Sequence, residues 1–375
     1  MKHRLVDLLQ CPCGRDGLAL ESEELEPVQF HDTLAEVRCH NACAFKKCSD
    51  PQISVKASDC TECYSHEIVR GSLRCQCGQK WPILGSIPRF LPKNMAEDLK
   101  KTQATFSSEW KMFRFGERNW GQTISFRKDQ FLSGMAVAPG DLKNKLMFDA
   151  GCGSGLLSIE LAKSFGIEVV ALDLAFGVEN AYRHNTSPYV YFMQGSVLEP
   201  PLRDRSVDFL YCCGVLVACP DTRTGFNAIV RTLKDGGRCF TWYYHPISPA
   251  YYPDAWRKLS VYNWIRTRIT SRLPIRAQYA LYLSWLPAFL IKQRIDILLK
   301  RRATLLTWRE KMQAWFDFFS PIYQHRHTPA EIISWYQSEG FPDAAVAYRE
   351  YEGFAVRGDL AGSGKAPCVT GGTER

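Results

Sequence analysis

Three alternating glycines followed by a distant acid are the residues in this sequence best suited to bind a nucleotide. Gly151, Gly153 and Gly155 are spaced as G-x-G-x-G, and Asp173 lies 22 residues after the first of them. Glycine lets a turn approach a ligand closely because it has no Cβ. A carboxylate at an offset of roughly 20 residues binds the ribose hydroxyls of an adenosine ligand in a doubly wound sheet. The spacing therefore predicts a site for an adenosine-containing cofactor.

The elements around these residues are predicted to follow the order strand, turn, helix, strand. Residues 146–148 form a short apolar run, residues 154–165 carry apolar side chains at helical spacing, and residues 167–172 form a second apolar run that ends at Asp173. The helix then begins at the glycine turn, where its free backbone N–H groups favour negative charge. This context distinguishes a nucleotide site from a chance glycine turn.

The segment DAGCGSG, with Asp149 before the first glycine, resembles motif I of the class I S-adenosylmethionine-dependent methyltransferases. The resemblance, and not the spacing alone, favours S-adenosylmethionine over NAD. It implies an α/β fold with a doubly wound, Rossmann-like sheet of seven strands in the order 3-2-1-4-5-7-6. Many members have an acid at the position of Ser196, so adenine contact there is expected to be weaker. The cofactor contacts that the resemblance implies are Asp149, Gly151, Cys152, Gly153, Gly155, Asp173, Leu174, Ser196, Val197 and Cys212.

Nine of the fifteen cysteines precede residue 80, which favours metal over disulfides next to a nucleotide-binding domain. Cys11 and Cys13 form one C-x-C pair, and Cys75 and Cys77 form another, each with a glycine directly behind it. Four thiolates satisfy tetrahedral zinc, so the two turns are predicted to form a structural zinc site.

The segments LLQCP and WPILGSIPRFLP resemble the zinc-ribbon activator protein of tRNA and protein methyltransferases, whose usual knuckle is C-x-x-C. A second zinc is predicted in the insertion between the two pairs, with Cys39, Cys43, Cys60 and Cys63 as ligands. The alternative is a single zinc site, with the other cysteines buried or free.

The chain of 375 residues is expected to contain more than one domain. We expect a cysteine-rich, zinc-ribbon-like domain at 1–92, connecting helices at 93–140, a methyltransferase domain at 141–357 and a disordered tail at 358–375. In the connection Phe106, Trp110 and Phe113 recur at helical spacing, which predicts a stripe facing the core. The resemblance to the methyltransferases implies that the same aromatic residues form a lid over the cofactor, and the two interpretations are not exclusive. No signal peptide or bilayer-spanning run is recognised, so a soluble, cytoplasmic protein is expected.

Residues 246–327 separate two expected elements of the sheet domain and are predicted to form a helical cap over the active site. The window from Trp256 to Lys311 holds thirteen Lys and Arg against Asp296 and Glu310, although the net charge of the chain is only +8. Three interpretations of this charge stay open: a solvated helix face, attraction to an anionic or membrane-embedded substrate, and RNA binding.

The end of the fourth strand of the predicted sheet bears on the methyl acceptor. Cys212, Cys213, Gly214 and Val215 stand there, in place of the acid or Asn-Pro-Pro-aromatic signature of enzymes that methylate base amines. The following segment resembles the small-molecule branch of the family, with Val217 and Ala218 replacing two histidines. A small or lipophilic metabolite is therefore the expected acceptor, and the candidate bases are His245, His325 and His327.

Two other functions are kept as alternatives. One is an RNA or protein methyltransferase in which the ribbon and the cap recognise a macromolecule, nucleic acid being the less favoured partner. The other is a catalytically silent protein that binds the cofactor, because Ser196, Val217 and Ala218 depart from the family pattern.

Overall fold

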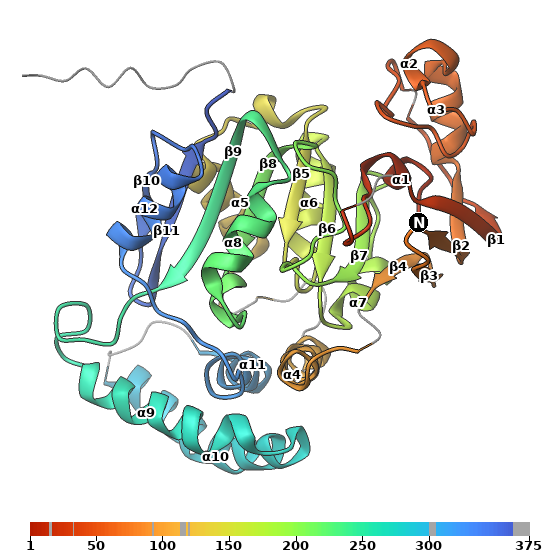
Figure 1. The fold of residues 1–375 in the computed structure, drawn as a ribbon. Coiled ribbons are helices and arrows are strands. Elements are labelled where there is room, and N and C mark those ends of the chain that lie inside the picture. The colour runs from red at the N-terminus through yellow and green to blue at the C-terminus, as the bar shows by residue number, and fades with distance from the viewer. Residues whose placement is uncertain are drawn as a thin grey trace, which may run out of the picture.

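The computed structural model describes residues 1–14, 17–32, 34–91, 94–112, 118, 121–299 and 305–362. Phe113 and residues 363–375 of the predicted tail lie outside this part of the chain. The described residues form a single mixed sheet of 11 strands, in the order β1-β2-β3-β4-β7-β6-β5-β8-β9-β11-β10, with helices on both faces (Figure 1).

The seven-stranded half of the sheet confirms the predicted fold. Its strands are β5 (Leu146–Ala150), β6 (Glu168–Asp173), β7 (Val190–Gly195), β8 (Val207–Cys213), β9 (Leu233–Tyr244), β10 (Ala345–Arg349) and β11 (Gly353–Asp359). Their order, β7-β6-β5-β8-β9-β11-β10, is the predicted 3-2-1-4-5-7-6. Every residue of β5, β6 and β7 is buried, because helices cover both faces of these parallel strands. Strand β11 runs to Asp359, two residues beyond the predicted domain limit at Arg357.

The helices of this half begin and end at residues that favour such ends. They are α5 (Ile124–Met135), α6 (Leu156–Phe165), α7 (Gly177–Arg183), α8 (Thr222–Val230) and α12 (Pro329–Ser338). The side chain of Asp221 caps α8 by accepting the Thr224 N–H at 2.6 Å, and that of Thr328 caps α12 by accepting the Glu331 N–H at 3.2 Å.

The N-terminal module continues the seven-stranded sheet, which the sequence did not predict. The module contains α1 (Arg4–Leu8), β1 (Ala19–Pro27), α2 (Pro51–Ser54), α3 (Ala57–Tyr64), β2 (His66–Arg74), β3 (Lys80–Leu84) and β4 (Ile87–Phe90). Strands β1 to β4 are antiparallel neighbours, and β4 then pairs in parallel with β7, Arg89 lying opposite Gln194. Without β4, the backbone groups of β7 would form an open edge of the seven-stranded sheet.

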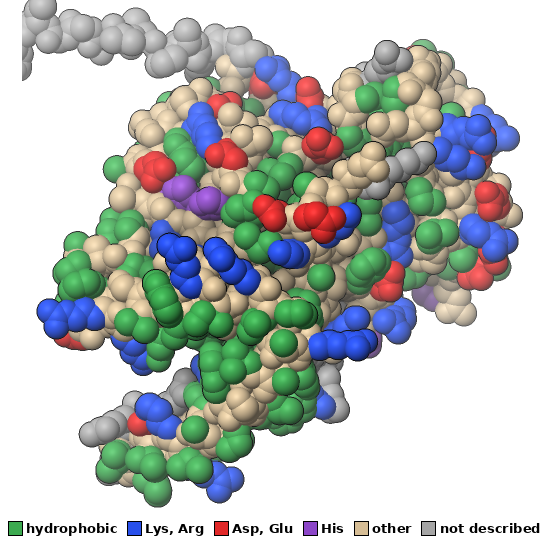
Figure 2. Space-filling model, turned by 60° about the horizontal axis from the view of Figure 1, so that its bottom comes forward, with side chains coloured by type: hydrophobic (Ala, Val, Ile, Leu, Met, Phe, Trp, Pro, Cys, Tyr) green, Lys and Arg blue, Asp and Glu red, His purple; other side chains and the backbone are tan. Residues whose placement is uncertain are grey.

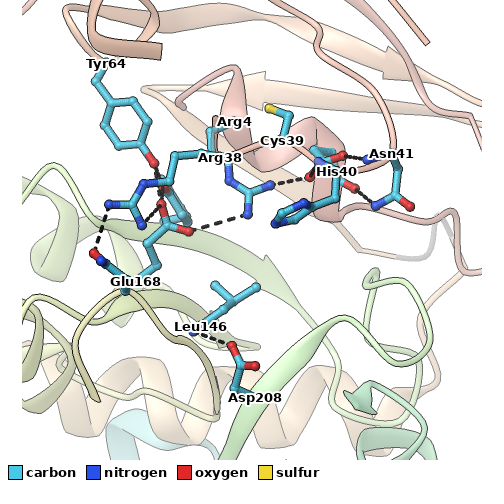
Figure 3. A network of polar contacts seen from close by, with 12 residues as sticks. Arg4, Arg38, Cys39, His40, Asn41, Tyr64, Leu146, Glu168 and Asp208 are labelled. Atoms are coloured by element: carbon cyan, nitrogen blue, oxygen red, sulfur yellow. Dashed lines mark hydrogen bonds and ion pairs between the residues drawn. The ribbon is translucent and has the colours of Figure 1, made fainter. Parts of the chain in front are cut away.

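A buried polar network joins the module to β6 (Figure 3). The Glu168 carboxylate, 3% exposed, accepts the Tyr64 hydroxyl at 2.5 Å and the Tyr191 hydroxyl at 3.2 Å. The Arg4 guanidinium lies 3.5 Å from the same carboxylate and also pairs with Asp7. The network therefore connects the first helix of the chain to the start of β6.

Replacing Glu168 by glutamine is expected to lower the free energy of unfolding by about 3 kcal/mol, because the buried Arg4 then loses one of its two carboxylate partners. Urea denaturation measures this loss. Glu160→Gln removes a surface carboxylate that lies 3.7 Å from the Lys163 ammonium, and should cost less than about 1 kcal/mol. Equal effects of the two substitutions would contradict a stabilising role of the network.

The predicted helical cap is confirmed. Helices α9 (Trp256–Arg268), α10 (Ile275–Leu298) and α11 (Trp308–Phe319) lie together with α4 (Glu97–Met112) beyond the carboxyl ends of the parallel strands (Figure 1). The cap has its own small core of Tyr282, Met312, Phe316 and Phe319. Helices α4 and α11 pack side by side, so segments about 200 residues apart in the chain meet beyond the carboxyl ends of the strands.

Candidate cofactor and acceptor site

The turn between β5 and α6 requires glycine at three positions. Gly151, Gly153 and Gly155 have φ values of 92°, 56° and 68°, a region that other residues rarely adopt. A Cβ at Gly151 would lie 2.2 Å from a methyl carbon of Val215, and one at Gly153 would lie 2.2 Å from the Trp110 ring. The N–H groups of Gly151 and Cys152 donate to the Leu172 carbonyl at 2.8 and 3.0 Å, which ties the turn to β6.

Two buried carboxylates flank this turn. Asp173, at the end of β6, accepts the N–H of Gly153 and the N–H of Ala175, both at 2.8 Å. Burial raises the pKa of Asp173, and these two hydrogen bonds oppose the rise. Asp149, in β5, accepts the Ser158 hydroxyl, and burial raises its pKa to about 6. The three glycines and Asp173, called the cofactor cradle below, therefore lie together at the ends of β5 and β6, and their predicted role in cofactor binding stays a prediction.

The other predicted cofactor residues lie at neighbouring strand ends. Ser196 and Val197 follow β7, and the Ser196 hydroxyl accepts the Leu198 N–H at 3.2 Å. Leu174 follows Asp173, and its carbonyl accepts the Gln194 side-chain amide at 3.1 Å. Cys212 is different, because its side chain is 1% exposed within the hydrophobic core. Only the backbone of Cys212 is therefore suited to a cofactor contact.

Helix α4 covers the glycine turn as a lid. Its Gln103 side chain donates to the Leu174 carbonyl at 3.0 Å, and its Ser107 hydroxyl accepts the Phe176 N–H at 3.0 Å. One turn further on, the Trp110 ring lies against Gly153 and Gly177. The aromatic stripe is interpreted as a core stripe or as a lid over the cofactor. The position of the Trp110 ring supports the lid.

A row of acids that the sequence did not indicate lies between the lid and the cap. Glu109 of α4 is 1% exposed, and its Oε1 accepts the Gln313 side-chain amide of α11 at 3.4 Å. Its Oε2 has no partner among the described residues. Burial, then repulsion from Asp317, raises the pKa of Glu109 well above its usual range. Glu109 also interacts electrostatically with Asp173, so the row extends towards the cofactor cradle.

Asp317 is the member of the row with a pKa near neutrality. It belongs to α11, and its Oδ2 accepts the Tyr244 hydroxyl at 3.3 Å, at the carboxyl end of β9. Burial, then repulsion from Glu352, raises the pKa of Asp317 to about 7. A carboxyl group with such a pKa can accept a proton at physiological pH.

The three candidate histidines make other contacts. The buried His245 ring stacks on Tyr251 and Phe354, with centroids 4.6 and 5.2 Å apart, and burial lowers its pKa. The His325 ring stacks on Tyr323, with centroids 5.8 Å apart. The His327 nitrogens contact the Glu331 carboxylate at 3.1 Å and the Thr222 hydroxyl at 3.2 Å. Both nitrogens of His327 are thus engaged between α12 and α8, a pattern typical of a structural histidine.

A wide cleft lies between the N-terminal module and α7. It has a volume of 1510 Å³ and is lined by Trp81, Arg89, Phe176 and Tyr182, among others. Gln194, at the end of β7, also lines it. The cleft therefore adjoins the β7 side of the cofactor cradle and is separate from the acid row.

The structure brings the two C-x-C turns together. The sulfur atoms of Cys11, Cys13, Cys75 and Cys77 all lie within 4.8 Å of one another. The Cys11–Cys77 and Cys13–Cys75 distances are 3.9 and 3.6 Å, close to the edge of about 3.8 Å in a tetrahedron with Zn–S bonds of 2.3 Å. The sulfur positions therefore fit a zinc ion despite the short C-x-C spacing.

The second predicted cysteine set is buried but less tightly gathered. Cys39, Cys43, Cys60 and Cys63 are each between 4% and 5% exposed, and the Lys46 N–H donates to the Cys43 sulfur at 3.4 Å. Among the described residues, the first cluster is the one group whose ligand atoms all meet the 4.8 Å distance. A second zinc site stays a prediction.

Comparison with known proteins identifies the central domain. Residues 148–241 match the family model described as a methyltransferase domain. A sterol 24-C-methyltransferase from Gibberella zeae is 27% identical over 149 residues, which cover 38% of each chain. A ubiquinone biosynthesis O-methyltransferase from Xanthomonas oryzae pv. oryzae is 34% identical over 104 residues, 27% of this chain and 43% of that protein. The chain thus spans less than half the length of these relatives.

Among solved structures, the magnesium protoporphyrin IX methyltransferase from Synechocystis is 14% identical, with a TM-score of 0.43. The match covers 71% of this chain and all of that one.

Proposed function

We propose that this chain, which contains a class I S-adenosylmethionine-dependent methyltransferase domain, methylates a small or lipophilic metabolite. The observation that carries the proposal is the cofactor cradle. Its three glycines have positive φ and no room for a Cβ, and Asp173 lies beside them at the end of β6. This combination suits an adenosine ligand, and the match of residues 148–241 to the methyltransferase domain supports S-adenosylmethionine as that ligand.

The bound cofactor would supply an electrophilic methyl group on a sulfonium ion. The protein then has to align the acceptor with that group and exclude water. Asp173 would hold the ribose hydroxyls, and the Ser196–Val197 segment would face the adenine. Trp110 would exclude water from the glycine turn. Asp317 would take the proton of an oxygen or carbon acid, a role that its contacts support better than those of the three histidines.

The closed cap favours a small or lipophilic acceptor over a macromolecule. Glu109 and Gln313 are 1% and 3% exposed where α4 meets α11, so the described part of the cap buries the acid row. The core of the described cap is apolar and aromatic, with Phe316 in it and Trp315 packed against it. An acceptor that fits there is compact or flexible, and largely apolar.

One structural zinc at Cys11, Cys13, Cys75 and Cys77 is part of the proposal, supported by the spacing of the four sulfur atoms. Zinc analysis of the purified protein tests it. One metal per chain supports this site alone, two support the Cys39, Cys43, Cys60 and Cys63 set as well, and none contradicts both.

The activity is tested in two steps. Isothermal titration with S-adenosylmethionine comes first, and absence of binding would contradict the proposal. A methylation screen with radiolabelled cofactor against metabolite and lipid extracts, bulk tRNA and unfolded protein follows. Transfer to a component of the extracts supports the proposal. Transfer to tRNA or protein alone would favour the macromolecular alternative, and binding without transfer would favour the silent one.

Replacing Asp173 by asparagine is expected to weaken S-adenosylmethionine binding by about 10- to 100-fold, because hydrogen bonds to a charged group contribute about 1.5–3 kcal/mol. Calorimetry measures the affinity. The matched control is Asp129→Asn, which neutralises an exposed acid of α5 and should leave the affinity unchanged. Unchanged affinity in the Asp173 variant would remove the ribose contact from the proposal.

A further inference from the structure

The outward side of α10 is apolar and uncovered. Its inward side packs on the cap through buried residues such as Tyr282 and Leu286. On the outward side, Tyr279, Leu283, Ile291, Ile295 and Leu298 are between 39% and 80% exposed. A helix that is hydrophobic on all sides is normally covered on all sides, by protein or by lipid. Within the described residues only one side of α10 is covered.

The middle of α10 carries no charge at all. Residues 277–291 contain no Asp, Glu, Lys or Arg, although their outward positions face solvent. Exposed apolar surface of this extent marks an interaction site on a protein that otherwise keeps charge on its surface. The described residues include no helix that is long and apolar enough to cross a membrane, so insertion of α10 across a bilayer does not explain the stretch.

Cations lie at both ends of the charge-free stretch and on the neighbouring α9. The exposed ones are Arg257, Lys258, Arg268, Arg272, Arg276, Lys292 and Arg294. Asp296 is the one acid between residues 256 and 299, and it pairs with Lys292. Trp264 of α9 is 57% exposed among these cations. On the cap side of the molecule, hydrophobic side chains gather with Lys and Arg side chains around them (Figure 2).

We propose that α9 and α10 form a docking surface for an anionic membrane. The apolar side of α10 enters the headgroup region, Trp264 lies at the interface, and the flanking cations contact acidic headgroups. Such a combination of apolar area and cationic flanks is what binds a helix in the plane of a bilayer. The docking places the cap, and the acid row beneath it, next to lipid.

The charge pattern favours an anionic bilayer over two other binding partners, a second copy of the chain and RNA. A second copy of the chain would bring two cationic faces together, which costs free energy. RNA would neutralise the cations but leave the apolar stretch 277–291 in water, since nucleic acid binding uses stacking on aromatic rings and phosphate contacts. An anionic bilayer matches both the apolar and the cationic parts. Binding of α9 and α10 to the membrane does not depend on catalysis. Only the transfer of a lipophilic acceptor from the membrane to the acid row rests on the proposed function.

Vesicle flotation of the full chain tests the proposal. The probes are vesicles of phosphatidylcholine alone and of phosphatidylcholine mixed with phosphatidylglycerol. The wild type is expected to float with the anionic vesicles and much less with the neutral ones. The double variant Leu283→Gln, Ile291→Gln is expected to partition at least about tenfold more weakly, because burial of apolar area drives insertion. Ile53→Gln is the control, since Ile53 is 84% exposed on α2, outside the cap.

Thermal melting and S-adenosylmethionine titration of the double variant show whether it is folded; both should match the wild type. Wild-type protein that stays unbound in the presence of anionic vesicles would overturn the proposal. Equal flotation of the double variant and the wild type would overturn it too. A concentration-dependent dimer in sedimentation without lipid, abolished by the double variant, would assign the surface to a second copy instead.

Discussion

Replacing Asp317 by asparagine is expected to lower kcat by about 10²- to 10⁴-fold, the usual contribution of a positioned acid or base. The affinity for S-adenosylmethionine should stay unchanged, because Asp317 belongs to the cap and not to the cofactor cradle. Burial, then repulsion from Asp317, raises the pKa of Glu109 well above its usual range, so Asp317 is the member of the row tested first. The acceptor found in the extract screen serves as substrate, and calorimetry gives the affinity.

The pH dependence of the same reaction distinguishes a base from a merely structural carboxyl group. Burial raises the pKa of Asp317 from 3.8 to about 7, so the group is protonated below that pH and cannot accept a proton. Wild-type kcat/KM should therefore rise as pH increases through about 7. The Asp317→Asn variant should not show this rise. The raised pKa also means that charging Asp317 opposes folding, so its protonated form favours the fold and that stability is lost as pH rises towards 7.

His327→Gln is the matched comparison. Its ring nitrogens contact Thr222 and Glu331, so the substitution is expected to change stability slightly and turnover little. Loss of turnover in His327→Gln or His245→Gln, together with full turnover in Asp317→Asn, would return the role of base to the histidines.

The local geometry of the candidate cofactor site could be predicted because its information is local. The glycines, the helix behind them and Asp173 all fall within residues 146–173, where hydrophobic period and turn chemistry fix the strand–turn–helix–strand order. The positive φ at Gly151 follows from the turn itself, so it could be predicted without knowledge of tertiary contacts.

The acid row that we propose for the acceptor half could not be predicted in the same way, and the histidine bases stay an untested prediction. Glu109 and Gln313 are 204 residues apart in sequence and meet only because α4 and α11 pack together. In the sequence, Asp317 lies in the aromatic run WFDFF. Nothing in that run distinguishes a buried acid from a solvated acid on a helix surface. The predicted bases were histidines because their ordinary pKa is near neutral. Burial gives Asp317 the same property, and burial depends on tertiary packing.

The joining of the two sheets was missed for a related reason. The C-terminal residues of the ribbon, which end in β4, form an ordinary short strand, and only the free edge of β7 makes a parallel pair with it favourable. Arg89 reinforces that pair by donating to the Gln194 side chain at 2.9 Å, and its other donor group reaches Glu179, also at 2.9 Å. The N-terminal module is therefore a structural part of the seven-stranded sheet, and its unfolding should disturb the end of β7.

Removing the metal is accordingly expected to unfold the N-terminal module and to disturb the cofactor site. A structural zinc contributes an apparent free energy of about 10–16 kcal/mol in small zinc domains, more than the whole stability of most domains. Cys75→Ser, or treatment of the wild type with a strong chelator, should lower the melting temperature and abolish zinc content at this site. Hydrogen exchange should rise in β1 to β4 and along β7, where the Arg89–Gln194 pair is lost.

Cys48→Ser is the matched control, because Cys48 is a half-buried cysteine of the same module outside the four-sulfur cluster. It should leave zinc content, melting temperature and exchange as in the wild type. In the metal-free protein, S-adenosylmethionine binding should weaken by about tenfold or less. Strands β5 and β6, which carry the glycine turn and Asp173, should remain folded, and only the end of β7 should become mobile. Unchanged exchange in β7 after complete removal of zinc would show that β4 holds its place without the metal, and the zinc would then be unnecessary for the joined sheet.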